Sequence, residues 1–289
     1  MKNATAQKIL RNNYNSEFWK ACRAEAWNRL QSAINSDGSL SWSKLPKLLG
    51  NNPKIEKGEK AGYATAILHL APSYASSINV CAMASVGCGM ACLNEAGHGQ
   101  RHMMQNGKHA VHIARVLRTF LFEYHRHEFL RQLDKEIKAH KKRAEKNGYI
   151  SAVRLNGTSD IVWEKKAPEL FSNNPGIIFY DYTKIPGRDV SAIDNYSLTF
   201  SLNESNRENA IAELKRGVNV AAVFRLKPGN KNRPGDPLPE TATIGGQSAP
   251  VIDGDETDLR FTDPDGVIVG LRAKGDAFAD NSGFVLEVN

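Results

Sequence analysis

Three of the four cysteines in this 289-residue chain lie within twelve residues of one another. Their spacing is Cys81-x6-Cys88-x3-Cys92, and Gly87 and Gly89 flank the middle thiol. Four cysteines are too few for a secreted disulfide scaffold, so metal binding or reactivity explains the clustering better than a disulfide does. Soft thiolates suit zinc or an iron–sulfur cluster. The two glycines would let the backbone wrap closely around such a centre.

Zinc and an iron–sulfur cluster need different ligand sets. A structural zinc ion takes four ligands, so His98 or His102 would have to join the three thiols. A 4Fe-4S cluster held by three cysteines leaves one iron open, and radical S-adenosylmethionine enzymes use that iron to chelate the amino and carboxylate groups of S-adenosylmethionine. Their usual spacing, Cys-x3-Cys-x2-Cys, differs from the spacing here. The place of the loop, directly after the first predicted strand, resembles those enzymes, and we favour the cluster over zinc.

Short apolar runs separated by turns predict the elements that would position this loop. The predicted strands cover residues 63–70, 151–155, 177–182, 196–202, 218–224 and 267–271. Between the fourth and fifth strands, Ser205 to Glu208 forms a capping box, and Gly217 stands where a helix ends. A strand, helix and strand with short links require a parallel pair. The sequence therefore predicts an α/β fold with a parallel sheet, a partial (β/α)6 barrel of radical-S-adenosylmethionine type.

Two segments flank or interrupt this predicted sheet. Residues 1–60 predict an N-terminal helical extension, in which Cys22 lies on the apolar stripe of a helix and is expected to be a buried structural thiol. Residues 61–289 would form the α/β metal-binding domain, with the cysteine loop at 81–92. Residues 227–250 contain five prolines and four glycines and predict a mobile insertion.

Polar residues follow the predicted strands, where parallel sheets place their chemistry. Six of them are candidate binding residues for S-adenosylmethionine and substrate: Asn156, Ser159, Asp160, Tyr182, Ser201 and Arg225. We expect these six rim residues to face the three sulfurs across one cavity. Asp160 and Arg225 would bind the ribose hydroxyls and the carboxylate of the cofactor, or else pair with each other. The sequence assigns no catalytic residue.

The chain carries 38 Lys and Arg against 31 Asp and Glu, a net charge of +7. Eight of the basic residues lie in a predicted amphipathic helix over residues 126–146, beside four acidic ones. This helix is either a solvated surface or the contact for a nucleic acid or nucleotide substrate. A second charged segment, from Asp253 to Asp265, holds six carboxylates. It predicts a solvated acidic turn or a site for a cation or a basic group.

No apolar run approaches the ~20 residues of a membrane helix, and the first residues do not match a signal peptide. We therefore expect a protein of the host-cell cytoplasm. The chain also contains no phosphate-binding glycine-rich loop, no nucleophile elbow and no zinc-protease motif.

Several segments together resemble the phage gene product 88 domain. They are Cys88-Gly-Met-Ala-Cys-Leu-Asn-Glu-Ala-Gly97, Arg154-Leu-Asn-Gly-Thr-Ser-Asp160, Phe179-Tyr-Asp-Tyr-Thr-Lys184, Asn219-Val-Ala-Ala-Val-Phe-Arg225, Val251-Ile-Asp-Gly-Asp-Glu-Thr-Asp-Leu-Arg-Phe261 and Val269-Gly-Leu-Arg-Ala-Lys-Gly275. The resemblance spans roughly residue 65 to the C-terminus. It implies a phage, prophage or plasmid origin and includes the cysteine loop, but it supplies no reaction.

These observations lead to two main functional hypotheses. The first is a phage- or plasmid-encoded iron–sulfur protein, a radical-S-adenosylmethionine-type enzyme acting on a nucleotide or nucleic acid. The second is a zinc-stabilised nucleic-acid-binding accessory protein without catalysis. A broader third hypothesis is a host-interaction protein whose cysteines only staple a loop. Oligomeric state is not predicted.

Overall fold

The computed structural model describes residues 3–50, 55–92, 110–226 and 236–288. His98 and His102, the predicted fourth ligands for zinc, lie outside the described residues. So do residues 227–235, the first part of the predicted insertion.

The described strands form one sheet, ordered β1-β2-β3-β4-β5-β6-β9-β8-β7, with β10 also paired to β6. Their bounds are β1 Leu49–Gly50, β2 Tyr63–Leu68, β3 Ile150–Arg154, β4 Ile178–Thr183, β5 Tyr196–Ser201, β6 Val220–Arg225, β7 Thr241–Ile244, β8 Gln247–Asp253, β9 Ile268–Arg272 and β10 Val285–Glu287. The pairs β1–β2 and β7–β8 are antiparallel. The pairs from β2 through β6 to β9 and β8, and the pair β10–β6, are parallel.

The predicted six-stranded partial barrel of radical-S-adenosylmethionine type is wrong, because the sheet is mixed and contains ten strands among the described residues. The six predicted strands correspond to β2, β3, β4, β5, β6 and β9. The four additional strands change the architecture. β1 adds an antiparallel edge from the N-terminal segment, the β7–β8 hairpin extends the opposite edge, and β10 pairs with β6.

Part of the predicted mobile insertion is regular structure. Residues 241–250 form β7 and the first half of β8, and Ile244 is fully buried. Gly245 and Gly246 both adopt positive φ and make the two-residue turn between the strands. Two glycines in this conformation are typical of a tight hairpin. The many prolines led to the prediction of a mobile segment, although the Gly245-Gly246 pair is typical of a hairpin turn.

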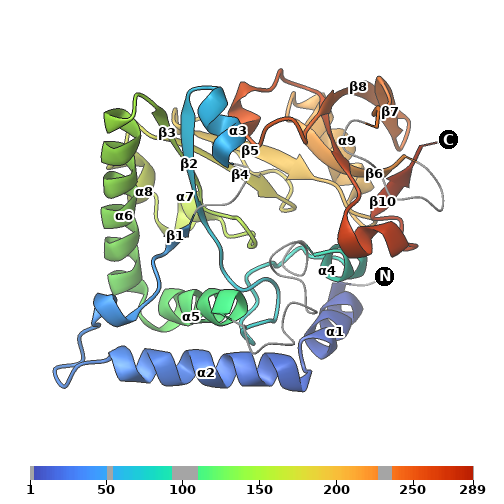
Figure 1. Ribbon diagram of the computed structural model, residues 1–289. Coiled ribbons are helices and arrows are strands. Elements are labelled where there is room, and N and C mark those ends of the chain that lie inside the picture. The colour runs from blue at the N-terminus through green and yellow to red at the C-terminus, as the bar shows by residue number, and fades with distance from the viewer. Residues whose placement is uncertain (1–2, 51–54, 93–109, 227–235, 289) are drawn as a thin grey trace.

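Helices cover the sheet and form a second layer (Figure 1). Their bounds are α1 Asn3–Asn13, α2 Glu17–Ala33, α3 Ile55–Lys60, α4 Val86–Met90, α5 Ala110–Tyr124, α6 Arg126–Lys146, α7 Trp163–Lys166, α8 Glu169–Ser172 and α9 Arg207–Lys215. α6 packs on β1, β2 and β3, while α5 lies between α6 and α2. In Figure 1, α2 and α5 form the layer below the sheet, with α1 and α4 at its right-hand end.

The N-terminal helices belong to the main hydrophobic core. Trp19 in α2, Phe129 in α6 and Phe179 in β4 are part of one buried cluster. Cys22 lies in the same cluster and is 1% exposed, which confirms the prediction of a buried structural thiol. Burial raises the pKa of this thiol to about 11. A second cluster, which includes Phe200, fills the space between β5, β6, β9 and α9.

Candidate functional site

The start of the cysteine loop is tied to the segment that follows β3. The Asp160 amide donates to the Val80 carbonyl at 2.8 Å, and the Thr158 hydroxyl donates to the Leu70 carbonyl at 2.6 Å. The Cys81 thiol lies 3.7 Å from the carbonyl oxygen of Thr158. These bonds hold Cys81 beside Asp160 at the carboxyl edge of β2 and β3.

Cys88 lies on α4, a helix of only five residues that its neighbours hold in place. Ser85 caps the helix by accepting from the Cys88 amide at 3.2 Å. The Glu204 carboxylate, which follows β5, accepts from the Gly87 amide at 2.8 Å and from the Ser85 hydroxyl at 2.6 Å. The position of Cys88 is therefore set by a residue 116 positions away in the chain.

The two glycines beside Cys88 serve helix packing. A Cβ atom at Gly87 would lie 2.8 Å from the Cβ of Phe284, and a Cβ at Gly89 would overlap the Leu10 side chain. α4 is thus pressed between α1 and the C-terminal segment. We predicted from sequence that these glycines wrap an inorganic centre; the observed close contacts are instead with protein side chains.

The three clustered thiols share their surroundings with the ammonium group of Lys184. Burial disfavours the charged form of Lys184, but Cys88, Asp160, Cys81 and Cys92 act on it more strongly in the opposite direction, so its pKa lies above the ordinary value. Burial raises the pKa of the Cys81 thiol, and Cys92, Cys88 and Asp160 add to that effect. The half-buried Lys184 is thus in the electrostatic neighbourhood of Cys81, Cys88 and Cys92, whereas Cys22 lies in the core.

Lys184 is held by two contacts at the ends of neighbouring strands. Its ammonium donates to the Ser201 hydroxyl at 2.7 Å, and its backbone amide donates to the Asp160 carboxylate at 2.8 Å. In the sequence, Lys184 ends a segment that resembles the phage domain, and no role was predicted for it. Its position after β4 was a usable signal, but the pattern alone does not show that its side chain bonds to Ser201.

A second half-buried cation, Arg115, is influenced by the charge of Cys92. Burial lowers the pKa of Arg115 in α5, and the charge of Cys92 acts in the opposite direction. The thiol site therefore combines three soft sulfur donors with positive charge from β4 and from α5. Within the described chain, no group of three or more His, Cys, Asp or Glu side chains is arranged to hold a single metal ion.

Of the six predicted rim residues, Asp160 and Ser201 lie at this site. Asp160 accepts from the Thr183 hydroxyl at 2.8 Å in addition to the Lys184 amide. Arg188 lies 3.6 Å from it. Burial raises the pKa of Asp160 despite these partners. Ser201 reaches the site through its bond from Lys184.

Asn156 and Ser159 form an internal scaffold for the same loop. The Asn156 side-chain oxygen accepts from the Ser159 hydroxyl at 2.9 Å and from the indole of Trp163 at 3.2 Å. The Asn156 backbone amide donates to Asp181 at 2.6 Å. Both residues are buried, and their polar groups hold the loop rather than project from it.

Tyr182 and Arg225 make their contacts elsewhere. The Arg154 guanidinium lies 4.6 Å from the centre of the Tyr182 ring, and Asp258 lies 3.2 Å from Arg154. Arg225 pairs with Glu287 in β10. The expected alternative of an Asp160–Arg225 ion pair is not found, because each of these residues has a different partner.

Several carboxylates of the acidic segment pair with arginines, while Glu256 and Asp265 are exposed. Arg272 forms a two-pronged pair with Asp253, with both N–O distances at 2.8 Å, and also contacts Asp255. Asp258 pairs with Arg154 as described above. Asp253, Asp255 and Asp258 therefore anchor the segment to β9 and β3 through Arg272 and Arg154, which the local sequence did not reveal.

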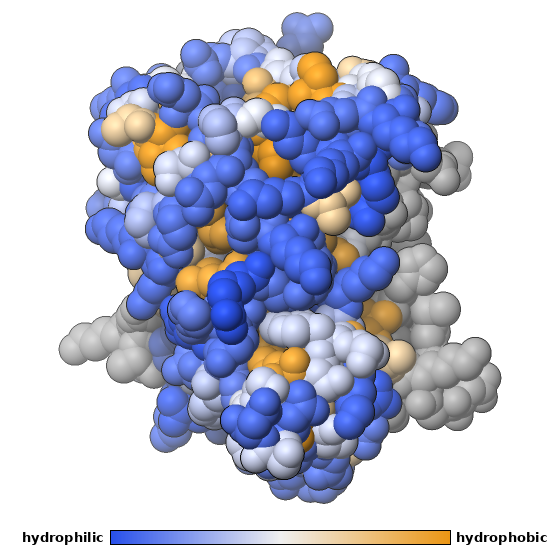
Figure 2. All heavy atoms as spheres, turned by 90° about the vertical axis from the view of Figure 1, so that its left-hand side faces the viewer, coloured by the Kyte–Doolittle hydropathy of each residue, from blue (hydrophilic) through white to orange (hydrophobic). Residues whose placement is uncertain are grey.

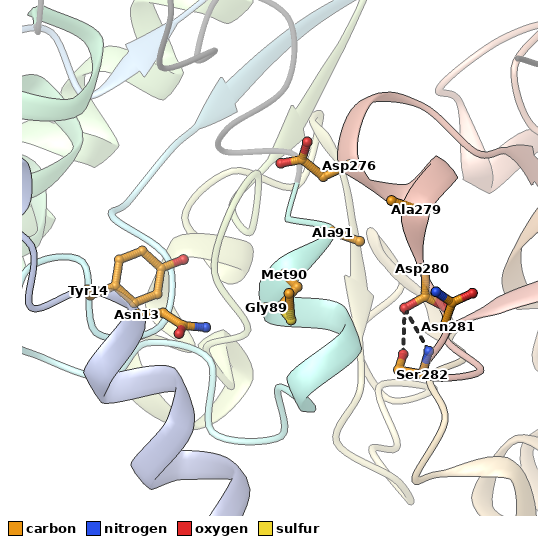
Figure 3. Close-up of a pocket in the computed structure, with 10 residues that line it drawn as sticks. All are labelled: Asn13, Tyr14, Gly89, Met90, Ala91, Asp276, Ala279, Asp280, Asn281 and Ser282. Carbon is orange, nitrogen blue, oxygen red and sulfur yellow. Dashed lines mark hydrogen bonds between the residues drawn. The ribbon is translucent and has the colours of Figure 1, made fainter.

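A pocket of about 660 Å³ opens on the outer side of α4 (Figure 3). It lies between α1, α4 and residues 276–282, and Met90 is 64% exposed at its edge. Neither the three sulfurs nor the six rim residues line it. The expected single cavity that unites all nine residues is therefore not this pocket.

The fold and site define an α/β protein with a mixed sheet and a loop of three half-buried cysteines at the carboxyl edge of its parallel strands. The chain belongs to the Gene product 88 family, whose model matches residues 43–287, and it is thus a phage protein. No curated protein and no solved structure matches the chain. The resemblance to radical S-adenosylmethionine enzymes has no support from the family match or the fold. In the described part of the chain, no helix has the length and apolar character needed to cross a membrane.

Proposed function

We propose that this phage protein is an iron–sulfur protein in which Cys81, Cys88 and Cys92 hold a 4Fe-4S cluster. The observation that carries the proposal is the anchoring of the loop that contains all three cysteines: Val80 bonds to Asp160 after β3, and Gly87 bonds to Glu204 after β5. A cluster bound by thiolates supplies electron-transfer or Lewis-acid chemistry. The residues of this chain would bind it, offset its charge and limit the access of water.

The donor set favours a cluster over a single zinc ion. Thiolates on one tetrahedral zinc lie about 3.8 Å apart, because each Zn–S bond is about 2.3 Å long. Zinc would need a fourth ligand in addition to the three thiols, and His98 and His102, the predicted ones, lie outside the described residues. A cubane cluster places three thiolates on three different irons, so it accepts a wider arrangement. Three thiolates also bring negative charge into a half-buried site, and Lys184 and Arg115 are near enough to offset it.

Metal analysis after anaerobic purification tests the proposal. We expect about four iron and four sulfide per chain and a brown protein. Cys88→Ala should lose the iron, while the matched variant Cys22→Ala should keep it, because Cys22 lies in the hydrophobic core. A colourless protein with one zinc per chain would support the zinc alternative with a histidine ligand. A wild type with neither metal, or equal metal in both variants, would overturn metal binding by this site.

Binding of S-adenosylmethionine stays a prediction that rests on the three cysteines alone. The partial (β/α)6 barrel that was predicted together with it is not the fold of this protein. Adding S-adenosylmethionine to the reduced, iron-loaded protein tests it directly. A changed electron paramagnetic resonance spectrum would support binding at the open iron. An unchanged spectrum would leave an iron–sulfur protein of another kind.

A further inference from the structure

One face of α6 carries a regular row of exposed cations, which we call the basic stripe. It consists of Arg131, Lys135, Lys138, Lys142 and Lys146, all of them exposed. Residues spaced by three or four positions lie on one face of a helix, so these five side chains form a single line. The line is about 22 Å long at a rise of 1.5 Å per residue.

The opposite face of α6 fixes the stripe in place. Phe129, Leu133 and Ile137 are fully buried in the main core, and His140 bonds the Ala64 carbonyl of β2 at 3.0 Å. The helix therefore cannot rotate its charges inward. Figure 2 looks onto this side of the molecule and shows a largely hydrophilic surface.

The stripe is only partly neutralised by its own protein. Lys138 pairs with Asp134 at 2.6 Å, and the neighbouring Lys141 lies 3.7 Å from Glu145. Among the described residues, the other four members of the stripe form no ion pair. The pair at Lys138 is exposed and contributes at most about 1 kcal/mol, so it would exchange readily for a phosphate.

We propose that the basic stripe binds the phosphate backbone of double-stranded DNA without reading its sequence. Neighbouring cations lie about 4.5–6 Å apart along a rigid line, a spacing that suits the regular phosphate rows of a duplex. The stripe contains no aromatic side chain on which unpaired bases could stack, which disfavours single strands. B-form DNA has a wide major groove that admits a helix, whereas that of duplex RNA is too narrow. The binding is independent of the proposed cluster.

Fluorescence anisotropy with a labelled duplex of about 20 base pairs tests this proposal across a salt titration. The stripe variant is Lys135→Gln/Lys142→Gln/Lys146→Gln in the full-length protein. The matched control is Lys8→Gln/Lys60→Gln/Lys215→Gln, which removes the same charge from exposed positions outside α6. Each lost phosphate contact lowers the slope of log affinity against log salt by about 0.9, so we expect the stripe variant to lose about 2.7. Its affinity should fall by roughly 10-fold or more, while the control stays near wild type.

Three results would overturn the proposal. They are a wild type without salt-dependent duplex binding, an equal loss in the two triple variants, and tighter binding of single-stranded DNA or duplex RNA than of duplex DNA. Thermal unfolding of each variant should match the wild type, because all six lysines are exposed. Iron content should not change in the stripe variant, so failure here and failure of the cluster proposal give different results.

Discussion

At the scale of single residues, the proposed thiol site depends on Lys184, which belongs to no recognised sequence motif. A buried ammonium costs free energy unless negative charge lies nearby. In this site the Asp160 carboxylate, which accepts from the Lys184 amide, supplies negative charge, and the cysteines would add to it once they bind a metal as thiolates. Arg188, the other cation near Asp160, is also paired with Glu164.

Replacing Lys184 should weaken metal binding without removing a ligand. Lys184→Met keeps the length of the side chain but leaves three thiolates without their counter-charge, so we expect metal affinity to fall by about 10-fold or more. Lys184→Arg restores the charge and should recover part of the affinity. Iron per chain and the reduction potential of each variant measure the effect. Equal iron content and potential in the Met, Arg and wild-type proteins would contradict this role.

Asp181 should make stability depend on pH. Burial raises the pKa of this fully buried carboxyl from 3.8 to about 7, although Asn156 and Tyr196 bond to it. Between these values the native protein keeps a proton that the unfolded chain has released. The stabilising contribution is therefore complete below about pH 4 and is lost as the pH rises through 7, by up to about 4 kcal/mol.

The variant Asp181→Asn isolates this effect, because it preserves the shape of the side chain and cannot ionise. Urea unfolding of both proteins from pH 4.5 to 7.5 gives the difference in unfolding free energy. We expect the variant to gain stability relative to wild type as the pH rises. A difference that stays constant over this range would show that Asp181 does not titrate there.

At the scale of elements, the placement of α4 rests on close packing against α1. A methyl group at Gly89 would overlap Leu10, so Gly89→Ala should cost about 1–3 kcal/mol of unfolding free energy. In a Leu10→Ala background the space is free, and the same substitution should cost close to zero. Chemical denaturation of the wild type, both single variants and the double variant gives this coupling. An equal cost of Gly89→Ala in both backgrounds would place the strain elsewhere.

Apolar patterning predicted the longer elements and failed for the shorter ones. The runs at β2 to β6 and β9 are recognisable because buried parallel strands need continuous apolar residues. β1 and β10 have two and three residues, too few for a pattern. Gly217 does end α9 with positive φ, but Ser205 bonds to Asn203 and caps nothing, because the helix begins one residue later.

In the candidate site, too, features that depend on neighbouring residues could be predicted, and contacts between distant segments could not. Clustering in the sequence pointed to Cys81, Cys88 and Cys92, since the loop that carries them is short, and their role as metal ligands stays a prediction. Contacts such as Glu204 with α4 and Arg272 with Asp253 join distant segments, and only the fold brings them together. The Asn156 side chain forms hydrogen bonds inside the protein, with Ser159 and Trp163. A polar residue at the end of a strand was therefore not enough to identify a binding residue.

At the scale of the whole molecule, the N-terminal segment should unfold together with the sheet. Trp19 is 1% exposed and packs edge-on against Tyr14 and His112, within the same core as β4 and α6. Trp19→Ala should therefore lower the unfolding free energy by about 3–5 kcal/mol. The neighbouring Lys20→Ala is the control and should change it by less than about 1 kcal/mol, because its side chain is exposed.

The number of steps in the denaturant unfolding transition tests this prediction more directly than the midpoint does. Because α2, α5, α6 and the sheet share one hydrophobic cluster, Trp19→Ala should move a single cooperative transition to lower denaturant without splitting it. Circular dichroism reports the helices, and tryptophan fluorescence reports both parts of the chain, because Trp27 and Trp42 lie in residues 1–60 and Trp163 is buried beyond them. Both signals should follow one transition with the same midpoint in the wild type and the variant. Two separate steps in either signal would show that residues 1–60 form a separable unit, as the sequence alone suggested.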